Sequence, residues 1–421
     1  MDFSLSQNLK KFSSACQSSG GKLFIVGGYV RNVLLSIPAY DIDICSSFST
    51  EKIIEIVETL GWNHKLISKK LGTVKIIAGS ESYEHTTFRK DTYANDGGHS
   101  PEHVEFINDI KCDALRRDFT ANAIYYDIKE NKIIDFFGGV KDIKKRQLKI
   151  INNDVFKVDG LRILRLIRFA TTLEFTINKK TLSSAIKNRH QLKDISKERV
   201  VDEFEKMTIA CNHANTKTFL QLLKKFECFK YIIPATANLQ IHLKHFKFYD
   251  APCESRYTAF CMTVLASYFD YQLNTKDQII FACHKIFGND GLSLSNRQIA
   301  DIFSTYIILQ YSFVKNPTPS LELICDYFNT SEEIKNFLRG ISPSITTLLD
   351  NEVDIYKAKN IPLNESQLDI TNIELLIRAN IENKYVSKIK QILFNLCLEE
   401  KIINEKTVLL ETAEILAKNM N

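Results

Sequence analysis

The distribution of glycine constrains the fold of this chain more than any other feature of its sequence. Twelve of the fifteen glycines lie at or before Gly160, and none lies between Gly160 and Gly288. Before Gly160, short β-rich runs such as 23–26, 74–77 and 104–107 alternate with helical stretches and turn residues. After it, apolar residues recur every three or four positions, for example in 161–170, 198–210 and 215–228. The sequence therefore predicts an α+β domain followed by an all-helical remainder.

Length and composition narrow the class of protein. A chain of 421 residues predicts roughly two to four domains. No apolar run approaches the roughly 20 residues that a membrane-spanning helix needs, so we expect a protein of the cytoplasm without a membrane partner. The ten cysteines are scattered singly and lack CxxC spacing, which favours reduced thiols over disulfides.

Positive charge is concentrated in the middle of the chain. Residues 151–250 hold 18 Lys and Arg against 10 Asp and Glu (+8), whereas residues 251–421 hold 16 against 21 (−5) and residues 1–150 hold 21 against 19 (+2). A polyanion-binding surface needs such a concentration, because each cation that meets a phosphate releases condensed counterions. Ordinary solvated helix faces are the alternative explanation.

A strand, a glycine turn and a helix are expected in residues 23–36. Gly27 and Gly28 allow the backbone to approach a ligand closely, and the helix that follows presents unpaired N–H groups at its N-terminus. Arg31 projects from the first turn of that helix. This arrangement suits a phosphate, although a tight turn alone would also explain the two glycines.

Two carboxylates follow ten positions later. Asp41 and Asp43 lie in a strand-like run that ends at Ile44, and side chains two residues apart on a strand project from the same face. Two oxygen ligands on one face suit Mg²⁺ and would repel each other without a cation. Such a pair can hold two metal ions for in-line nucleotidyl transfer. A DxD sequence on an ordinary surface strand is the competing interpretation.

A family resemblance rests on five ordered motifs within roughly residues 22–207. The segment GGYVRNVLLSIPAYDIDICS resembles the first motif of class II tRNA nucleotidyltransferases (CCA-adding enzymes) and bacterial poly(A) polymerases. RRDFTANA at 116–123 resembles the second motif, DFFGGVKD at 135–142 the third, DGLRILRLIRF at 159–169 the fourth, and SKERVVDE at 196–203 the fifth. The C-terminal half matches only in its helical character.

The resemblance implies a domain plan. It implies a nucleotidyltransferase head of the polymerase-β type over residues 1–145 and a helical neck that recognises the nucleotide base over 146–207. A helical body and tail that bind tRNA would follow over 208–421. The reaction implied is template-independent addition of CTP- and ATP-derived nucleotides to the 3′ end of tRNA.

The resemblance also implies roles for single residues. Asp41 and Asp43 would bind catalytic Mg²⁺, Gly28 and Arg31 would contact the incoming nucleotide, and Arg117 would contact its phosphates. The sequence departs from the family pattern at three positions. Asn32 stands where Asp is usual, Ser36 where Gly is usual, and Val158 where Glu is usual.

Four residues of the fourth motif are expected to read the base and the triphosphate. Arg162, Arg165 and Arg168 fall on one broad side of a helix, beside Asp159. The resemblance assigns base selection to Asp159 and Arg162, which pair an acceptor with a donor. Cytosine and adenine both present an amine next to a ring acceptor, so we expect CTP and ATP as substrates. A salt-bridged helix face is the alternative.

Two segments bear on which reaction of the family is expected. Residues 86–101 predict a strand end followed by a polar, glycine-containing mobile loop that resembles the flexible loop of full CCA-adding enzymes. LGTV at 71–74 resembles CCA-adding enzymes more than bacterial poly(A) polymerases. The alternatives are a poly(A) polymerase, a CC-only or A-only enzyme and, from another class, a non-catalytic RNA-binding protein.

Overall fold

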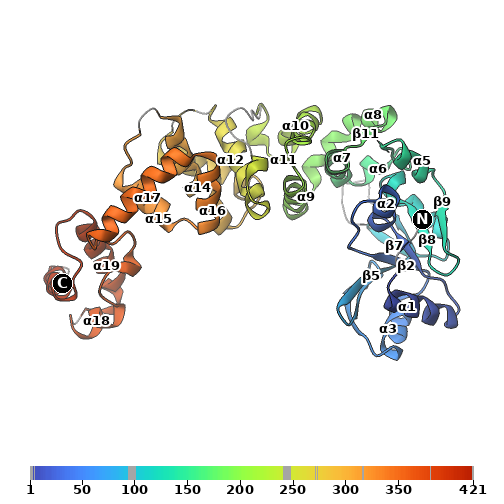
Figure 1. Cartoon of the computed structure of the whole chain (residues 1–421), viewed down its shortest axis with the longest axis horizontal. Coiled ribbons are helices and arrows are strands. Elements are labelled where there is room, and N and C mark those ends of the chain that lie inside the picture. The colour runs from blue at the N-terminus through green and yellow to red at the C-terminus, as the bar shows by residue number, and fades with distance from the viewer. Residues whose placement is uncertain are drawn as a thin grey trace. The chain divides into compact units, whose positions relative to one another are not determined.

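The computed structural model divides the chain into two compact units, Met1–Asn238 (unit 1) and Leu239–Asn421 (unit 2). It describes residues 3, 5–92, 101–239, 248–270, 272, 274–314, 317–379 and 381–419. Figure 1 shows sheet and helices in unit 1 and helices in unit 2. Within these described residues, no helix is both long and apolar enough to cross a membrane.

A seven-stranded mixed sheet forms the centre of unit 1. Its strand order is β3-β4-β5-β2-β1-β8-β9, and β2 pairs with β5 in parallel whereas the other neighbours are antiparallel. The strands are β1 (Phe24–Val26), β2 (Asp43–Ser46), β3 (Asn63–Ser68), β4 (Thr73–Ala78), β5 (Glu81–Thr87), β8 (Ile124–Asp127) and β9 (Lys132–Asp135). Every residue of β1 and β8 is buried, as expected for central strands.

Two short strand pairs accompany this sheet. They are antiparallel β6 (Arg89–Thr92) with β7 (His103–Phe106), and parallel β10 (Gln147–Leu148) with β11 (Thr176–Ile177). The loop predicted over 86–101 therefore begins with the end of β5 and with β6. Residues 93–100, where the glycine-containing part of that prediction falls, lie outside the described residues.

The helices of unit 1 pack on the sheet and then on one another. Those of the head are α1 (Gln7–Ser18), α2 (Gly28–Leu35), α3 (Thr50–Thr59), α4 (Ile110–Leu115) and α5 (Gly139–Lys144). They are followed by α6 (Val155–Val158), α7 (Leu161–Thr172), α8 (Lys179–Asn188), α9 (Lys197–Ile209), α10 (Thr216–Lys225) and α11 (Cys228–Ile232). α7 contacts both α9 and α10, and its Ile and Leu side chains are buried.

Helices make up the regular structure of the described part of unit 2. They are α12 (Arg256–Tyr268), α13 (Lys276–Phe287), α14 (Asn296–Gln310), α15 (Leu321–Asn329), α16 (Glu332–Ile341), α17 (Pro343–Ala358), α18 (Asn372–Ile377), α19 (Asn383–Leu398) and α20 (Lys406–Lys418). Capping boxes begin α13 at Thr275 and α14 at Ser295. A separate apolar core that includes Leu375, Ile389 and Leu409 holds α18, α19 and α20 together.

The predicted fold class is confirmed, because a mixed sheet with helices precedes a helical remainder. The two-residue strands β10 and β11 are small exceptions within the expected helical neck. The boundaries near residues 145 and 207 stay predictions. None of the ten cysteines, all of which are described, takes part in a disulfide.

Candidate active site

One cavity of unit 1 gathers all the residues that the sequence singled out. It encloses about 1000 Å³ at the end of the sheet where β1 leads into α2. Its walls come from the strand and turn residues of the head and from α7 and α9. The nine predicted site residues in its lining are Gly28, Arg31, Asp41, Asp43, Arg117, Asp159, Arg162, Arg165 and Arg168.

The turn between β1 and α2 requires glycine at its first position. Gly27 has φ 79°, a conformation that side chains rarely adopt, and it directly precedes the first residue of α2, Gly28. A Cβ atom at Gly27 would lie 3.7 Å from both Arg117 Nη1 and Asp43 Oδ2. The turn therefore brings bare backbone to the centre of the cavity, between a cation and a carboxylate.

The two aspartates open onto this cavity, but the strand that carries them is shifted from its predicted position. β2 begins at Asp43 and runs to Ser46, so Asp41 lies in the preceding loop. Asp43 is the first residue of β2 that pairs with β5, and its partner there is Glu84. The carboxylates line one cavity nevertheless.

The surroundings of Asp43 favour a bound cation. Enclosure by the cavity walls, followed by the charges of Glu84 and Asp41, raises the pKa of Asp43 to about 6 against the opposing effect of Arg117. Among the described residues, no cluster of three or more His, Cys, Asp or Glu side chains forms a metal cage. Two carboxylates fit Mg²⁺, which typically takes one or two from the protein and completes its shell with water and phosphate oxygens.

Arg31 is held rigidly at the wall of the cavity. Its Nη1 donates to Asn122 Oδ1 at 2.6 Å, and its Nε and Nη2 donate to Asn32 Oδ1 at 3.1 and 2.8 Å. Burial and the nearby charge of Arg168 lower the pKa of Arg31 to about 10. A buried guanidinium with like-charged neighbours is stabilised by an anion, so this wall is suited to phosphate.

Three arginines surround the ring of Phe169. The guanidinium carbons of Arg31, Arg165 and Arg168 lie 5.0, 5.4 and 4.4 Å from the ring centroid. Arg165 Nε donates to Asp118 at 2.8 Å. Burial would raise the pKa of Asp118, but Arg165 and Asn122 outweigh it and lower the pKa to about 2.

Arg168 has its own counter-ion, because its Nε donates to Glu203 of α9 at 2.7 Å. Sequence reasoning missed Phe169, Asp118 and Glu203 as functional residues. The two carboxylates lie 47 and 35 positions from the arginines they hold, and no local pattern marks that pairing.

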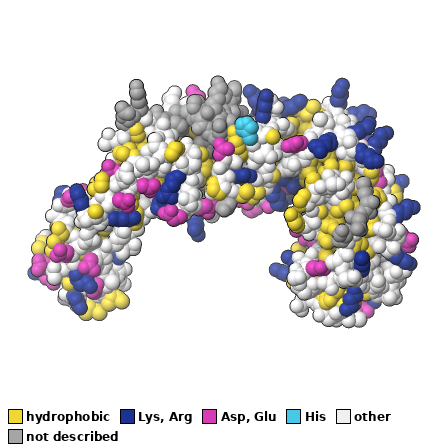
Figure 2. Space-filling model, in the orientation of Figure 1, with side chains coloured by type: hydrophobic (Ala, Val, Ile, Leu, Met, Phe, Trp, Pro, Cys, Tyr) yellow, Lys and Arg dark blue, Asp and Glu magenta, His cyan; other side chains and the backbone are white. Residues whose placement is uncertain are grey.

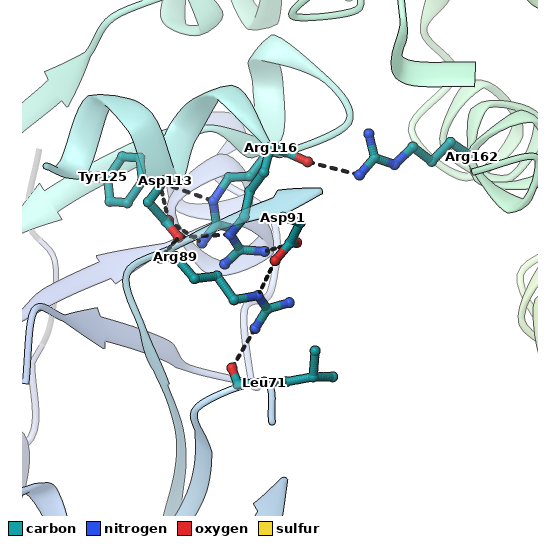
Figure 3. A network of polar contacts seen from close by, with 8 residues as sticks. Leu71, Arg89, Asp91, Asp113, Arg116, Tyr125 and Arg162 are labelled. Atoms are coloured by element: carbon teal, nitrogen blue, oxygen red, sulfur yellow. Dashed lines mark hydrogen bonds and ion pairs between the residues drawn. The ribbon is translucent and has the colours of Figure 1, made fainter. Parts of the chain in front are cut away.

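A buried network around Asp113 and Tyr125, which Figure 3 shows, also fixes Arg117. Arg117 Nε donates to Tyr125 Oη at 3.1 Å and its Nη2 to Asp113 Oδ2 at 3.4 Å. Asp113 also accepts from Tyr125 Oη at 2.6 Å and from Arg116 Nε at 2.8 Å. Burial opposes ionisation of Asp113, yet Arg117 and Arg116 lower its pKa to about 2. The adjacent arginines are therefore anchored by one ionised carboxylate.

The same network reaches the neighbouring strands and α7. Arg89 Nη1 donates to the carbonyl oxygen of Leu71 at 2.6 Å, and Arg89 Nε donates to Asp91 at 2.9 Å (Figure 3). Arg162 Nη2 donates to the carbonyl oxygen of Arg116 at 2.8 Å. A hydrogen bond thus joins α7 to the residues that hold Arg117.

Asp159 pairs with an arginine that sequence reasoning did not consider. Its Oδ2 accepts from Arg199 Nη2 of α9 at 2.8 Å, and its Oδ1 accepts from the backbone N–H of Leu161 at 3.0 Å. The carboxylate therefore ties the start of α7 to α9. Arg162 lines the same cavity, and its Nη2 donates to the carbonyl oxygen of Arg116.

Comparisons with known proteins agree with this geometry. Residues 23–149 match the family model described as "Poly A polymerase head domain", and residues 174–239 match "Probable RNA and SrmB- binding site of polymerase A". The CCA-adding enzyme of Lactococcus lactis subsp. cremoris is 39% identical over 221 residues, which are 51% of this chain and 52% of that enzyme. This match thus spans about half the length of that relative.

Other relatives are similar over nearly their whole length. The CCA-adding enzyme of Ligilactobacillus salivarius is 29% identical over 94% of this chain and 93% of its own. The structure of the Bacillus stearothermophilus CCA-adding enzyme in complex with CTP superposes with a TM-score of 0.65 at 20% identity, over 98% of both chains. The Thermotoga maritima CCA-adding enzyme complexed with tRNA superposes with a TM-score of 0.55 at 19% identity, over 98% of this chain and 96% of that one. At these identities the superpositions show the fold.

A mixed sheet that ends in a glycine turn, with two carboxylates and an arginine wall around one cavity, has the architecture of a polymerase-β-type nucleotidyltransferase head. The head motifs, the helical remainder and the matches over both agree on one group within this class. Residues 23–149 match a poly(A) polymerase head domain, residues 174–239 match an RNA-binding region of the same polymerases, and the chain is similar to CCA-adding enzymes over 94% of its length.

Proposed function

We propose that this protein adds the CCA sequence to the 3′ end of tRNA, using CTP and ATP without a template. The observation that carries the proposal is the single cavity in which Asp41 and Asp43 face a wall of arginines. The names of the relatives over both halves of the chain support CCA addition rather than another reaction of the family. The LGTV segment at 71–74 also favours CCA addition, because it resembles CCA-adding enzymes more than bacterial poly(A) polymerases.

We assign Asp41 and Asp43 the role of holding Mg²⁺. Mg²⁺ held by these two carboxylates would lower the pKa of the attacking 3′-hydroxyl and would neutralise charge on the leaving pyrophosphate. The raised pKa of Asp43 supports this role, because a cation would relieve the repulsion among Asp43, Glu84 and Asp41. Glu84 lies directly opposite Asp43 in the sheet and is a candidate to position the hydroxyl.

The arginine wall would bind the triphosphate. At the start of α2, the backbone N–H groups at Gly28 and the guanidinium of Arg31 would bind the phosphates. Arg117 would bind them beside Asp43. Arg165 and Arg168 extend this wall along α7. Because their counter-ions also hold them in place, they present fixed donors to the phosphates with little loss of conformational entropy.

Base selection is proposed for Asp159 and Arg162. Both line the cavity, and each would turn part of its hydrogen-bonding capacity to the edge of the base. A carboxylate accepts from the exocyclic amine of cytosine or adenine and disfavours the carbonyl of uracil or guanine. Arg199 would keep the carboxylate ionised and oriented through their 2.8 Å pair.

The RNA partner is proposed to be tRNA. The +8 charge of residues 151–250 supports a polyanion surface, and the RNA-binding family match covers 174–239. Figure 2 shows Lys and Arg side chains gathered over the part of unit 1 that carries α8 and α10. We assign the helical body and tail after residue 208 to tRNA binding as well. A cytoplasmic location fits the cysteines, none of which takes part in a disulfide.

An incorporation assay tests the enzyme class. Full-length protein is incubated with tRNA that lacks its 3′ CCA, labelled CTP or ATP, and Mg²⁺, and a parallel reaction contains a chelator. We expect label in RNA only with Mg²⁺ and not with the Asp41→Asn or Asp43→Asn variants. Label from neither nucleotide would favour the RNA-binding alternative.

A further inference from the structure

The cavity has a second flank, on the side of Asp43 that faces away from the arginine wall. In strand order, β1 with its glycine turn lies on one side of β2, and β5 and β4 lie on the other. Asp43 of β2 is opposite Glu84 of β5, and Glu84 is opposite Lys75 of β4. Directly opposed residues project from the same face, so the three side chains form a row with Lys75 roughly 10 Å from Asp43.

Tyr40 stands beside this row. It directly precedes Asp41, lines the cavity and is 86% exposed, the largest exposed fraction among the large apolar side chains of the described residues. Among the described residues, the side chains of Tyr40 and Lys75 make no hydrogen bond or ion pair. An exposed aromatic ring and an unpaired ammonium group in the lining of one cavity match the combination that binds single-stranded nucleic acid.

The loop that carries Tyr40 is anchored rather than loose. Ser36 ends α2 in the left-handed conformation at φ 57°, and the backbone N–H of Ile37 donates to the carbonyl oxygen of Asn32 at 3.1 Å. Asn32 Nδ2 donates to the carbonyl oxygen of Pro38 at 3.1 Å. An aspartate at position 32 could not make this donation. The departure from the family pattern at this position thus coincides with a fixed support for Tyr40.

The chemistry of the proposed function assigns this flank to the RNA. In-line transfer requires the attacking oxygen and the leaving pyrophosphate on opposite sides of the reacting phosphorus. If the triphosphate occupies the arginine wall, the RNA end approaches from the side of Glu84 and Lys75. We propose that Tyr40 and Lys75 form a subsite for the 3′-terminal nucleotide of the RNA, in which the ring stacks on the base and the ammonium meets a phosphate. This inference rests on the proposed function.

A kinetic comparison of Tyr40 variants tests the stacking role. We expect Tyr40→Ala to raise KM for tRNA lacking CCA by roughly tenfold, because one stacked base contributes on that scale, and to leave KM for CTP unchanged. Tyr40→Phe retains the ring and should behave as the wild type. An unchanged KM for RNA, or a raised KM for CTP in its place, would overturn the assignment.

A binding measurement separates this inference from the proposed function. The probe is an RNA with 2-aminopurine as its 3′-terminal base, mixed with full-length protein and no nucleotide. Wild type and Tyr40→Phe should quench its fluorescence, whereas Tyr40→Ala should not. If the wild type fails to incorporate nucleotides, the proposed function falls, and the quenching still decides whether Tyr40 stacks on the base. Equal quenching by all three proteins would refute the subsite.

Lys75 is tested through the salt dependence of RNA binding. Lys75→Ala should lower the slope of log Kd against log salt by about one, because one phosphate contact is lost. Lys132→Ala is the matched control, since Lys132 is an exposed strand lysine of β9 at the other edge of the sheet. Equal slopes for wild type and Lys75→Ala, or equal reductions in both variants, would remove Lys75 from the subsite.

Discussion

Replacing Asp118 with Asn should expose how the arginine wall is held in place. Asp118 is 5% exposed and accepts from Arg165 Nε at 2.8 Å, from Asn122 at 3.1 Å and from the backbone N–H of Phe119 at 2.8 Å. Asparagine retains one acceptor oxygen but leaves Arg165 without its counter-ion. Breaking one side of a buried pair costs about 3–5 kcal/mol, and we expect the lower end because the Arg165 side chain is 34% exposed.

The pH dependence of this loss follows from the lowered pKa of Asp118. The folded value of about 2 lies below the unfolded value of 3.8, so the contribution is present above the unfolded value and is lost as pH falls through the folded one. The shift corresponds to about 2 kcal/mol, of which about 1 kcal/mol is lost between pH 7 and pH 3. The difference in unfolding free energy between wild type and Asp118→Asn should shrink by that amount.

Urea titration followed by tryptophan fluorescence measures this difference in unfolding free energy for unit 1, which contains Asp118. Trp62 is the only tryptophan in the chain, and it lies against Phe12 in the head. Asp127→Asn is the matched control: Asp127 is 3% exposed, but its partner Lys22 is a half-exposed lysine, so we expect a smaller loss. The reasoning fails if Asp118→Asn is as stable as the wild type at pH 7, or if their difference is the same at pH 3.

The remaining predictions concern catalysis and RNA binding. Asp41→Ala and Asp43→Ala should abolish turnover and leave tRNA binding nearly intact, and near-normal rates in either variant would remove that residue from catalysis. Asp159→Ala should lower discrimination against UTP and GTP by about 1–3 kcal/mol in kcat/KM, and unchanged preferences among the four nucleotides would refute base reading. Arg199→Ala keeps the Asp159 carboxylate and is the control for Asp159→Ala, and it should lose less discrimination. Paired Lys-to-Ala changes within residues 151–250 should flatten the salt dependence of tRNA affinity more than changes in the acidic region 251–421, and the reverse result would relocate the RNA site.

Local sequence patterns predicted the parts of this structure that depend on neighbouring residues. The glycine turn, the helix after it and the amphipathic α7 form where they were expected, because turn chemistry and helical periodicity act over a few positions. The motif residues line one cavity, although nothing in the spacing of Asp43 and Arg165 indicates that they meet. There the family resemblance, rather than periodicity, supplied the expectation.

Long-range pairings could not be predicted in this way. The sequence does not mark Glu84 as the neighbour of Asp43, because the register of β2 against β5 depends on how the strands align in the folded sheet. It also does not mark Arg199 as a partner of Asp159, because Arg199 lies 40 positions away on α9. Such partners follow from the packing of α7 against α9, which a single helix pattern does not specify.

The central claim is that the cavity adds three defined nucleotides to tRNA. The most direct measurement is a product ladder, at single-nucleotide resolution, on a tRNA that ends before CCA. CTP alone should give two additions on this reading, CTP with ATP should give three and then stop, and UTP or GTP should give none. A long tail from ATP alone would instead identify a poly(A) polymerase, and a ladder that stops at two additions with both nucleotides present would contradict full CCA addition.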